Sequence, residues 1–102
     1  MTNLNKIFKE KVPCKSVWFM RQAGRYLPEF RKIRSNNQNF IKLCLNSELS
    51  SEITLQPIKR FDLDSAIIFS DILMVPYALG QKVEFIKDRG PKLSDFDLNI
   101  FL

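Results

Sequence analysis

Apolar residues occur along the chain in short runs that differ in periodicity. Residues 17 to 20 form an unbroken apolar run, which predicts a short buried strand because it is too short for a core helix. Residues 65 to 71 are richer in β-forming residues and predict a second, clearer strand. Trp18, Phe19 and Phe69, which lie in these runs, are expected in the core. A strand, a long connection and a strand together predict a βαβ unit with two parallel strands.

Helical periodicity precedes the first run and fills the connection. Residues 4 to 11 fit a short amphipathic helix that Pro13 ends. Three helical segments are predicted in the connection: residues 29 to 34 after Pro28, residues 40 to 44, and residues 47 to 60 with Asn46 or Ser47 as the cap. Because proline lacks an N–H group, Pro57 is expected to kink or shorten the last helix.

The C-terminal third has weaker patterns. Residues 72 to 79 are apolar and fit a helix despite Pro76. Residues 83 to 86 fit a small edge strand, and residues 88 to 93 have the composition of a loop. No internal repeat, low-complexity tract or linker is found, so the 102 residues are expected to form one domain at most.

The charge balance is mildly basic, with 16 Lys and Arg against 11 Asp and Glu and a net charge of +5. This excess suits a nucleic acid, an anionic membrane or a polyanionic small molecule and does not choose among them. Without histidine, His-based zinc sites and Ser-His or Cys-His pairs are excluded within these residues. Cys14 and Cys44 stand alone and are expected to be reduced thiols. No signal peptide or membrane-length apolar run is found, so the cytoplasm is the expected location.

Charged residues follow both predicted strands directly. Arg21 and Arg25 follow the first, and Asp71 follows the second. Because catalytic and binding residues lie at the carboxyl ends of parallel strands, these three side chains are expected to converge at the same end of the sheet. The arginines would bind carboxylates or phosphates through their forked donors. Asp71 could accept hydrogen bonds from N–H groups and stabilise a developing positive charge.

Structural explanations of the same residues stay open. An aspartate after a strand can also cap a helix or pair with a nearby arginine. Arg31, Lys32 and Arg34 are typical of a solvated helix face. No glycine-rich nucleotide-binding loop is found. No nucleic-acid-binding motif is recognised, and the basic residues are not interleaved with aromatic ones in the way such proteins favour.

Two long stretches carry a family resemblance. WFMRQAGRYLPEFRKIR, residues 18 to 34, resembles the N-terminal signature of the uroporphyrinogen decarboxylase family. TLQPIKRFDLDSAIIFSDILMVPYALG, residues 54 to 80, resembles the family's next block, and GPKL matches a later piece. The resemblance covers residues 16 to 93 or so. It implies an α/β fold that is the N-terminal portion of a (β/α)8 TIM barrel, a homodimer, no nucleic-acid or membrane partner, and no metal or organic cofactor.

The resemblance also implies a reaction and a site. The family decarboxylates the four acetate side chains of uroporphyrinogen III to give coproporphyrinogen III in haem biosynthesis. The implied substrate-binding residues are Arg21, Gln22, Ala23, Gly24, Arg25, Arg34 and Asp71. Of these, Asp71 would lie beneath the macrocycle, where the pyrrole N–H groups converge, and would stabilise the cation formed by protonating a pyrrole carbon. Arg21 would orient the reacting acetate and take part in proton delivery.

A complete barrel takes roughly 250 residues, so the chain is expected to hold about two of the eight strands as one incomplete domain, 1–102. It is expected to be an N-terminal piece of a longer protein or a truncated remnant, inactive alone. The family's later tyrosine, serine and histidine contacts have no counterpart in it. The alternatives are a small basic binding module and a relative in the cobalamin-linked methyltransferase branch. Against the latter, the intact RQAGR loop and the IIFSD stretch favour the decarboxylase.

Overall fold

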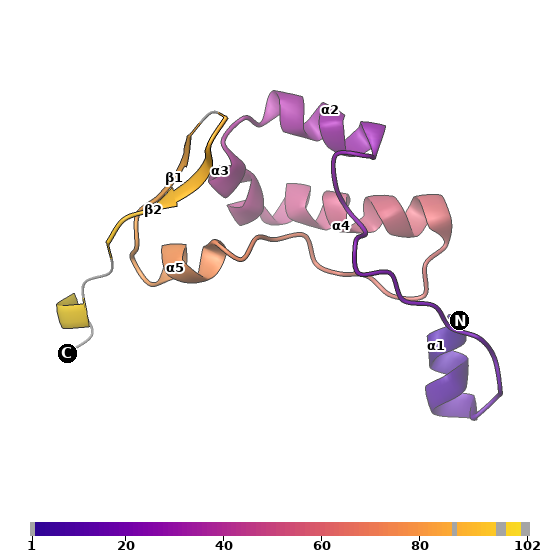
Figure 1. Cartoon of the computed structure of the whole chain (residues 1–102). Coiled ribbons are helices and arrows are strands. Elements are labelled where there is room, and N and C mark those ends of the chain that lie inside the picture. Colours follow the sequence, from indigo (N-terminus) through magenta and orange to yellow (C-terminus); the bar gives the residue numbers. More distant parts are fainter. Residues whose placement is uncertain (1, 87, 96–97, 101–102) are drawn as a thin grey trace. The chain divides into compact units, whose positions relative to one another are not determined.

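The computed structural model describes residues 2–86, 88–95 and 98–100 (Figure 1). The chain divides into two compact units, Met1–Phe69 and Ser70–Leu102, and each is described by itself. The first unit contains α1 (Asn3–Asn5), the π-helical turn η1 (Lys6–Glu10), α2 (Pro28–Asn36), α3 (Phe40–Leu45) and α4 (Ser47–Phe61). The second contains α5 (Met74–Ala78), β1 (Val83–Ile86), β2 (Gly90–Leu93) and the 3₁₀ turn η2 (Leu98–Ile100).

Local sequence explains where the three connecting helices begin. Pro28 lies in the first turn of α2, where its missing N–H group costs nothing. Asn39 caps α3 by accepting a hydrogen bond from the Lys42 N–H group at 3.0 Å. Asn46 caps α4 in the same way, accepting from the Leu49 N–H group at 3.0 Å. All three predicted helices are therefore confirmed, and the cap of the last is Asn46.

The end of α4 is set by backbone conformation. Pro57 does not shorten the helix, which continues to Phe61. The next residue, Asp62, adopts the left-handed conformation with φ of 50°, and its N–H group donates to the Ile58 carbonyl at 2.9 Å. Aspartate is among the few residues other than glycine that adopt this conformation readily, so the chain can reverse here.

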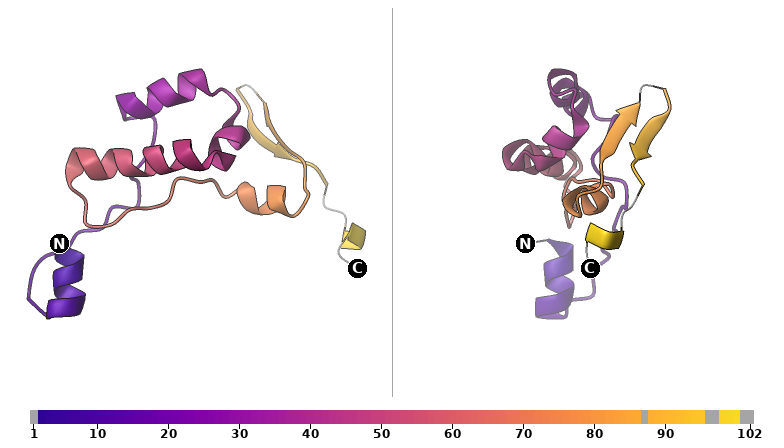
Figure 2. Two further views of the ribbon diagram at one scale, coloured as in Figure 1. Left: turned by 180° about the vertical axis from the view of Figure 1, so that it is seen from behind. Right: turned by 90° about the vertical axis from the view of Figure 1, so that its left-hand side faces the viewer.

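The core of the first unit lies where α2, α3 and α4 meet, and Figure 2 shows α2 and α4 side by side in both views. Its buried members are Leu27, Phe30, Leu43 and Ile53. Phe69 packs against this cluster, with its ring centroid 5.8 Å from that of Phe30 in an edge-to-face arrangement. Phe69 therefore contributes to the core, as predicted.

Neither predicted strand forms, so this part of the prediction is wrong. Residues 17 to 20 lack regular secondary structure, and the side chains of Trp18 and Phe19 are 58% and 55% exposed rather than buried. A parallel strand needs neighbours for its backbone groups and cover for both faces. No described residue bonds the backbone of residues 17 to 20. Residues 65 to 69 bond with side chains instead of with another strand.

The N-terminal helical turns are confirmed over α1 and η1. Leu4 and Ile7 are half-buried, whereas Phe8 is exposed. The turns end at Lys11, which adopts a positive φ of 53° two residues before Pro13. The short amphipathic segment therefore ends a little before the predicted breaker.

The strands of the described chain form one antiparallel hairpin in the second unit. Val83 of β1 lies opposite Leu93 of β2, and Ile86 lies opposite Gly90. The predicted edge strand at 83 to 86 is confirmed, and α5 confirms a helix within residues 72 to 79. The loop predicted at 88 to 93 is wrong from Gly90 onward, because residues 90 to 93 form β2 and pair with β1. The described residues thus form a small α/β structure with no parallel strand pair.

Stability should depend on the helical core rather than on apolar residues in general. Leu43 and Leu45 lie in the same helix, with 1% and 57% of their surface exposed. We expect Leu43→Ala to lower the free energy of unfolding by about 2–5 kcal/mol, because a buried leucine leaves a cavity. Leu45→Ala, the matched control, should cost much less in the same urea titration. Equal losses would contradict the described core.

Candidate functional site

The segment from Arg21 to Arg25 is a loop that is held by hydrogen bonds of the buried Gln22 side chain and by a closing backbone bond. The Gln22 side chain is buried, its amide nitrogen donates to the Ser65 carbonyl at 2.9 Å, and its amide oxygen accepts from the Ile67 N–H group at 2.9 Å. The Leu27 N–H group closes the turn by donating to the Gly24 carbonyl at 3.0 Å. The two arginines at the ends of this loop remain exposed.

Arg21 is the cationic member of a largely apolar pocket of about 460 Å³. The pocket is lined by Phe19, Arg21, Tyr26, Phe61 and Leu63. The rings of Tyr26 and Phe61 are stacked, with centroids 6.5 Å apart. The Tyr26 hydroxyl also donates to the Gln22 carbonyl, which joins this wall to the loop. The pocket therefore offers one guanidinium beside flat apolar surfaces.

Arg25 lines a different pocket, of about 440 Å³, with two further arginines. Its described lining is Arg25, Phe30, Arg31, Arg34, Ser35 and Gln38, which includes no carboxylate. Arg31 and Arg34 are three residues apart on α2, so they share a helix face. Three cations without an acidic neighbour in the lining make this pocket suited to an anion with more than one negative group.

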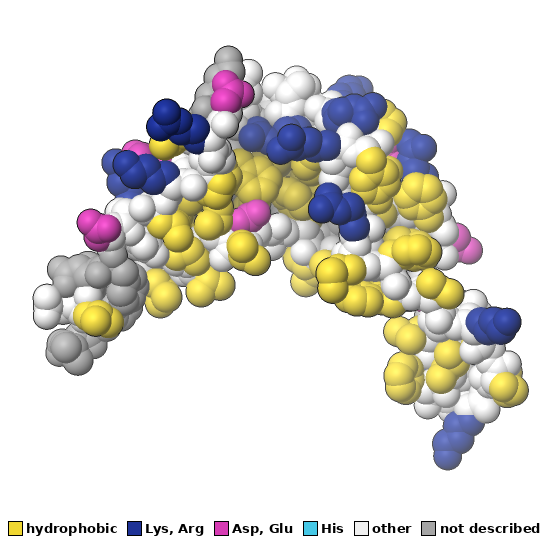
Figure 3. All heavy atoms as spheres, viewed as in Figure 1, with side chains coloured by type: hydrophobic (Ala, Val, Ile, Leu, Met, Phe, Trp, Pro, Cys, Tyr) yellow, Lys and Arg dark blue, Asp and Glu magenta, His cyan; other side chains and the backbone are white. Residues whose placement is uncertain are grey.

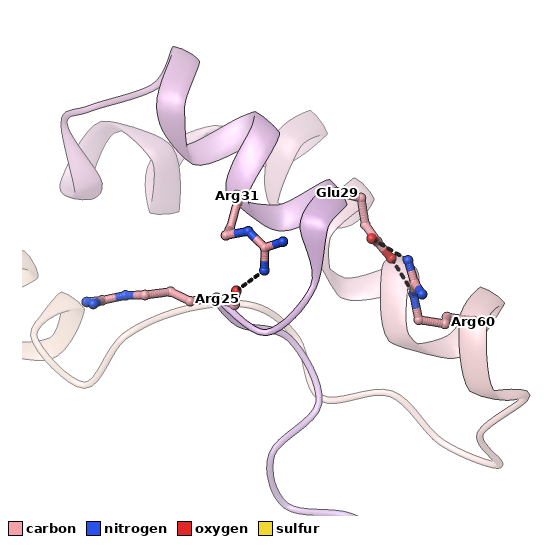
Figure 4. A network of polar contacts seen from close by, with 4 residues as sticks. All are labelled: Arg25, Glu29, Arg31 and Arg60. Carbon is pink, nitrogen blue, oxygen red and sulfur yellow. Dashed lines mark hydrogen bonds and ion pairs between the residues drawn. The ribbon is translucent and has the colours of Figure 1, made fainter.

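Two of these three guanidinium groups are held by backbone carbonyls. Figure 4 shows the Arg31 Nη1 atom donating to the Arg25 carbonyl, at 2.7 Å, while the Arg25 side chain points away. The Arg34 Nη1 atom donates at 2.6 Å to each of the carbonyls of Asn37 and Gln38. These bonds fix the guanidinium groups. Neither arginine forms an ion pair among the described residues, although the charge of Arg31 helps to lower the pKa of Glu29.

Arg21 and Arg25 have neither a hydrogen-bond partner nor an ion-pair partner for their side chains among the described residues. A contrast is provided by Arg60, which Figure 4 shows facing Glu29 across α2 and α4. Its Nε and Nη2 atoms donate to the two carboxylate oxygens of Glu29 at 2.9 and 2.8 Å. The fold thus pairs a structural arginine fully and leaves both loop arginines available to a ligand.

Asp71 belongs to the second unit, so its predicted convergence with the loop arginines stays a prediction. Its Oδ1 atom accepts from the Leu73 N–H group at 2.9 Å, and its carbonyl accepts from the Met74 N–H group at 3.0 Å. The carboxylate bond spans two residues and lies before α5, whose start has no side-chain cap, so the helix-cap alternative is not realised at Asp71. This bond also fixes the direction of the carboxylate.

The other members of the predicted site have different surroundings. Ala23 packs against the helical core, and Gly24 has φ of 156°, which a residue with a side chain rarely adopts. On the face drawn in Figure 3, apolar side chains reach the surface between Lys and Arg side chains. Within the described ranges, His, Cys, Asp and Glu form no group of three or more that could hold a metal ion. None of the described helices is long and apolar enough to cross a membrane.

Sequence reasoning missed three contributors to this region. Arg31 is exposed, as predicted for a solvated helix face, and it also lines the pocket with Arg25. Its spacing of three residues from Arg34 is the signal that could have found it. Ser50 and Thr54 also carry a signal in the sequence, because hydroxyl residues four apart beside Ile53 lie on the inner face of α4.

Comparison with known proteins identifies the family. The profile of the uroporphyrinogen decarboxylase (URO-D) family matches residues 2–99. The chain is 56% identical over 88 residues to a uroporphyrinogen decarboxylase of Maricaulis maris (strain MCS10). This alignment covers 86% of this chain and 26% of the relative. A uroporphyrinogen decarboxylase of Acidiphilium cryptum (strain JF-5) is 58% identical over 81 residues, or 79% of this chain and 23% of the relative. A uroporphyrinogen decarboxylase of Rickettsia rickettsii (strain Sheila Smith) is 54% identical over 87 residues, or 85% of this chain and 24% of the relative.

The chain therefore belongs to the uroporphyrinogen decarboxylase family, which confirms the resemblance found in the sequence. It spans about a quarter of the length of the curated relatives it matches.

The Glu29–Arg60 pair predicts a pH dependence of stability. The hydrogen bond from Arg60 holds the pKa of Glu29 below the ordinary glutamate value of 4.5. The pair therefore stabilises the fold fully above pH 4.5, and this stabilisation is lost as the pH falls through the lowered pKa. We expect Glu29→Gln to be less stable than the parent at pH 7 and the difference to shrink on acidification, as measured by urea unfolding at several pH values.

Glu52→Gln is the matched control, because Glu52 lies exposed on α4 and has no ion pair among the described residues. If both variants showed the same pH dependence, the pair would have no role in linking α2 to α4.

Proposed function

We propose that this chain is the N-terminal segment of an enzyme that decarboxylates the acetate side chains of uroporphyrinogen III to give coproporphyrinogen III in haem biosynthesis. The observation that carries the proposal is the loop from Arg21 to Arg25, whose two end guanidinium groups have no protein partner in the described structure. Family membership at more than half identity over most of the chain supports it.

The two pockets fit different parts of such a substrate. A uroporphyrinogen has a flat, largely apolar ring system with carboxylates around its rim. The pocket of Arg25, Arg31 and Arg34 would bind rim carboxylates through charge-assisted hydrogen bonds. The pocket of Arg21 would place a carboxylate beside the stacked rings of Tyr26 and Phe61, which suit the edge of a macrocycle.

The chemistry requires an electron sink, and the substrate can provide one. Protonation of a pyrrole at carbon makes that ring cationic, and the electrons of the breaking bond to carbon dioxide then flow into it. The methylene carbon left behind takes up a proton and becomes a methyl group. The ring carbon then releases the proton that it gained at the start, and the neutral pyrrole is restored. Asp71 would stabilise the cation and accept pyrrole N–H donors, while Arg21 orients the reacting acetate and takes part in proton delivery. The hydrogen bond from the Leu73 N–H group to one Asp71 oxygen would fix the orientation of that carboxylate.

The proposed assembly is larger than the described structure. The family resemblance supports a (β/α)8 barrel, of which this chain would form the N-terminal portion, and a homodimer of such barrels. The exposed apolar side chains of residues 17 to 20 support this, because a neighbouring strand and a covering helix would bury them. The chain alone is proposed to be inactive, since it holds only part of such a site.

The proposal can be tested in a chimera. The corresponding segment of the Maricaulis maris relative is replaced by this chain, and the formation of coproporphyrinogen is measured. Activity of the chimera is expected. An inactive but folded chimera, which binds no uroporphyrin, would refute the proposed function.

Asp71→Asn in the chimera should lower kcat by about 100-fold or more while KM changes little, because electrostatic stabilisation of the transition state is removed. Asp88→Asn is the matched control, since Asp88 is an exposed turn residue whose φ of 64° asparagine also adopts. Normal turnover in Asp71→Asn would rule out the role given to Asp71.

Arg25→Gln should raise KM by about tenfold with a smaller change in kcat, because a charge-assisted contact to substrate is lost in the ground state and transition state alike. Arg89→Gln, at an exposed position of the hairpin turn, removes the same charge and serves as the control. Equal effects of the two substitutions would show that only the net charge matters.

A further inference from the structure

The side-chain amide of Gln22 makes a pattern of hydrogen bonds that is normally made by a strand. Its nitrogen donates to the carbonyl of Ser65, and its oxygen accepts from the N–H group of Ile67, both at 2.9 Å. These two backbone groups flank Ala66 and belong to one extended stretch. In a parallel ladder, a residue bonds in this way to the residues before and after its partner. The Gln22 amide thus occupies the place of the N–H and C=O groups of one residue on a neighbouring parallel strand.

A second anchor holds the same stretch two residues further on. The Thr54 hydroxyl accepts from the Phe69 N–H group at 2.8 Å, and the Ser50 hydroxyl donates to the Phe69 carbonyl at 2.7 Å. Thr54 in turn donates to the Ser50 carbonyl one helical turn away, also at 2.7 Å. The backbone of residues 65 to 69 is therefore bonded by α4 at one point and by the arginine loop at another.

Both anchors are buried, which makes their loss costly. The Gln22 side chain is only 4% exposed, and Ser50 and Thr54 are buried as well. An amide nitrogen and an amide oxygen that are both satisfied by backbone have little capacity left for a ligand. Removing the side chain would leave a carbonyl and an N–H group without partners beside the core.

We propose that Gln22 is a positioning residue, whose amide sets the register between the arginine loop and the stretch of residues 65 to 69. The register would fix where the loop that carries Arg21 and Arg25 lies along this stretch, and the stretch ends at the boundary of the first unit. The consequence for catalysis rests on the proposed function, whereas the register itself does not. Gln22 then acts through the placement of Arg21 and Arg25 rather than by contact with the substrate.

Amide hydrogen exchange of the whole chain tests the register directly. In the parent, the Ile67 amide should exchange at least about tenfold more slowly than the Ile68 amide, which has no hydrogen-bond partner among the described residues. Gln22→Met keeps the length of the side chain and removes both bonds, so protection of Ile67 should be lost. Protection of Phe69 should persist, because Thr54 still bonds it.

Thr54→Val is the crossed control, in which Phe69 should lose its protection and Ile67 should keep it. Equal exchange of the Ile67 and Ile68 amides in the parent would overturn the register, and so would retained protection of the Ile67 amide in Gln22→Met. Loss of protection at both positions in both variants would also overturn it, since a general loosening needs no specific bond.

The chimera separates this inference from the proposed function. In the chimera, Gln22→Met should lower kcat about tenfold, because the loop arginines are held less precisely. The same substitution should change KM less than Arg25→Gln does, because the arginines that contact the substrate carboxylates are still present. An unchanged kcat would refute the positioning role even if the exchange results hold. A folded chimera that is inactive with the parent segment and binds no uroporphyrin would refute the proposed function, and the exchange results would still decide the register.

Discussion

The first unit depends on side chains that bond the backbone of an extended stretch where no strand does so. Residues 65 to 69 cross the inner side of the helices without a strand beside them, and a buried backbone left without partners would be unstable. Gln22, Ser50 and Thr54 supply those partners from the loop and from α4. Because these bonds hold Phe69 against Phe30 and Leu43, the polar anchoring and the apolar core form one arrangement. The arginine loop gains its fixed inner side from the same bonds.

Much of the helical structure could be predicted because its causes are local. Asn46 is three residues from the N–H group it caps, and Pro28 fits a first helical turn wherever it occurs. The strands could not be judged locally, since a run such as residues 17 to 20 becomes a strand only when a neighbour bonds it. The hairpin shows the reverse case, because the loop-like composition around Pro91 concealed residues that pair with β1.

The candidate site shows the same division between local and distant causes. The exposed cations Arg21 and Arg25 were evident from their position after an apolar run, and the structure leaves both without partners in its described part. The distribution of the arginines over two pockets depends on how α2 packs, so the sequence could not predict it. Asp71 shows a third case, because its Oδ1 atom bonds the Leu73 N–H group within the second unit, whereas its proposed chemical role depends on parts of the enzyme outside that unit.

Trp18 is the single tryptophan of the chain, and its position gives the molecule a built-in optical reporter. The indole is more than half exposed, three residues before Arg21 and within the apolar run that the proposed barrel would bury. Indole emission shifts to shorter wavelength when water is removed from around the ring. The intrinsic fluorescence of the protein therefore follows the covering of this surface without any added label, whatever polypeptide comes to cover it.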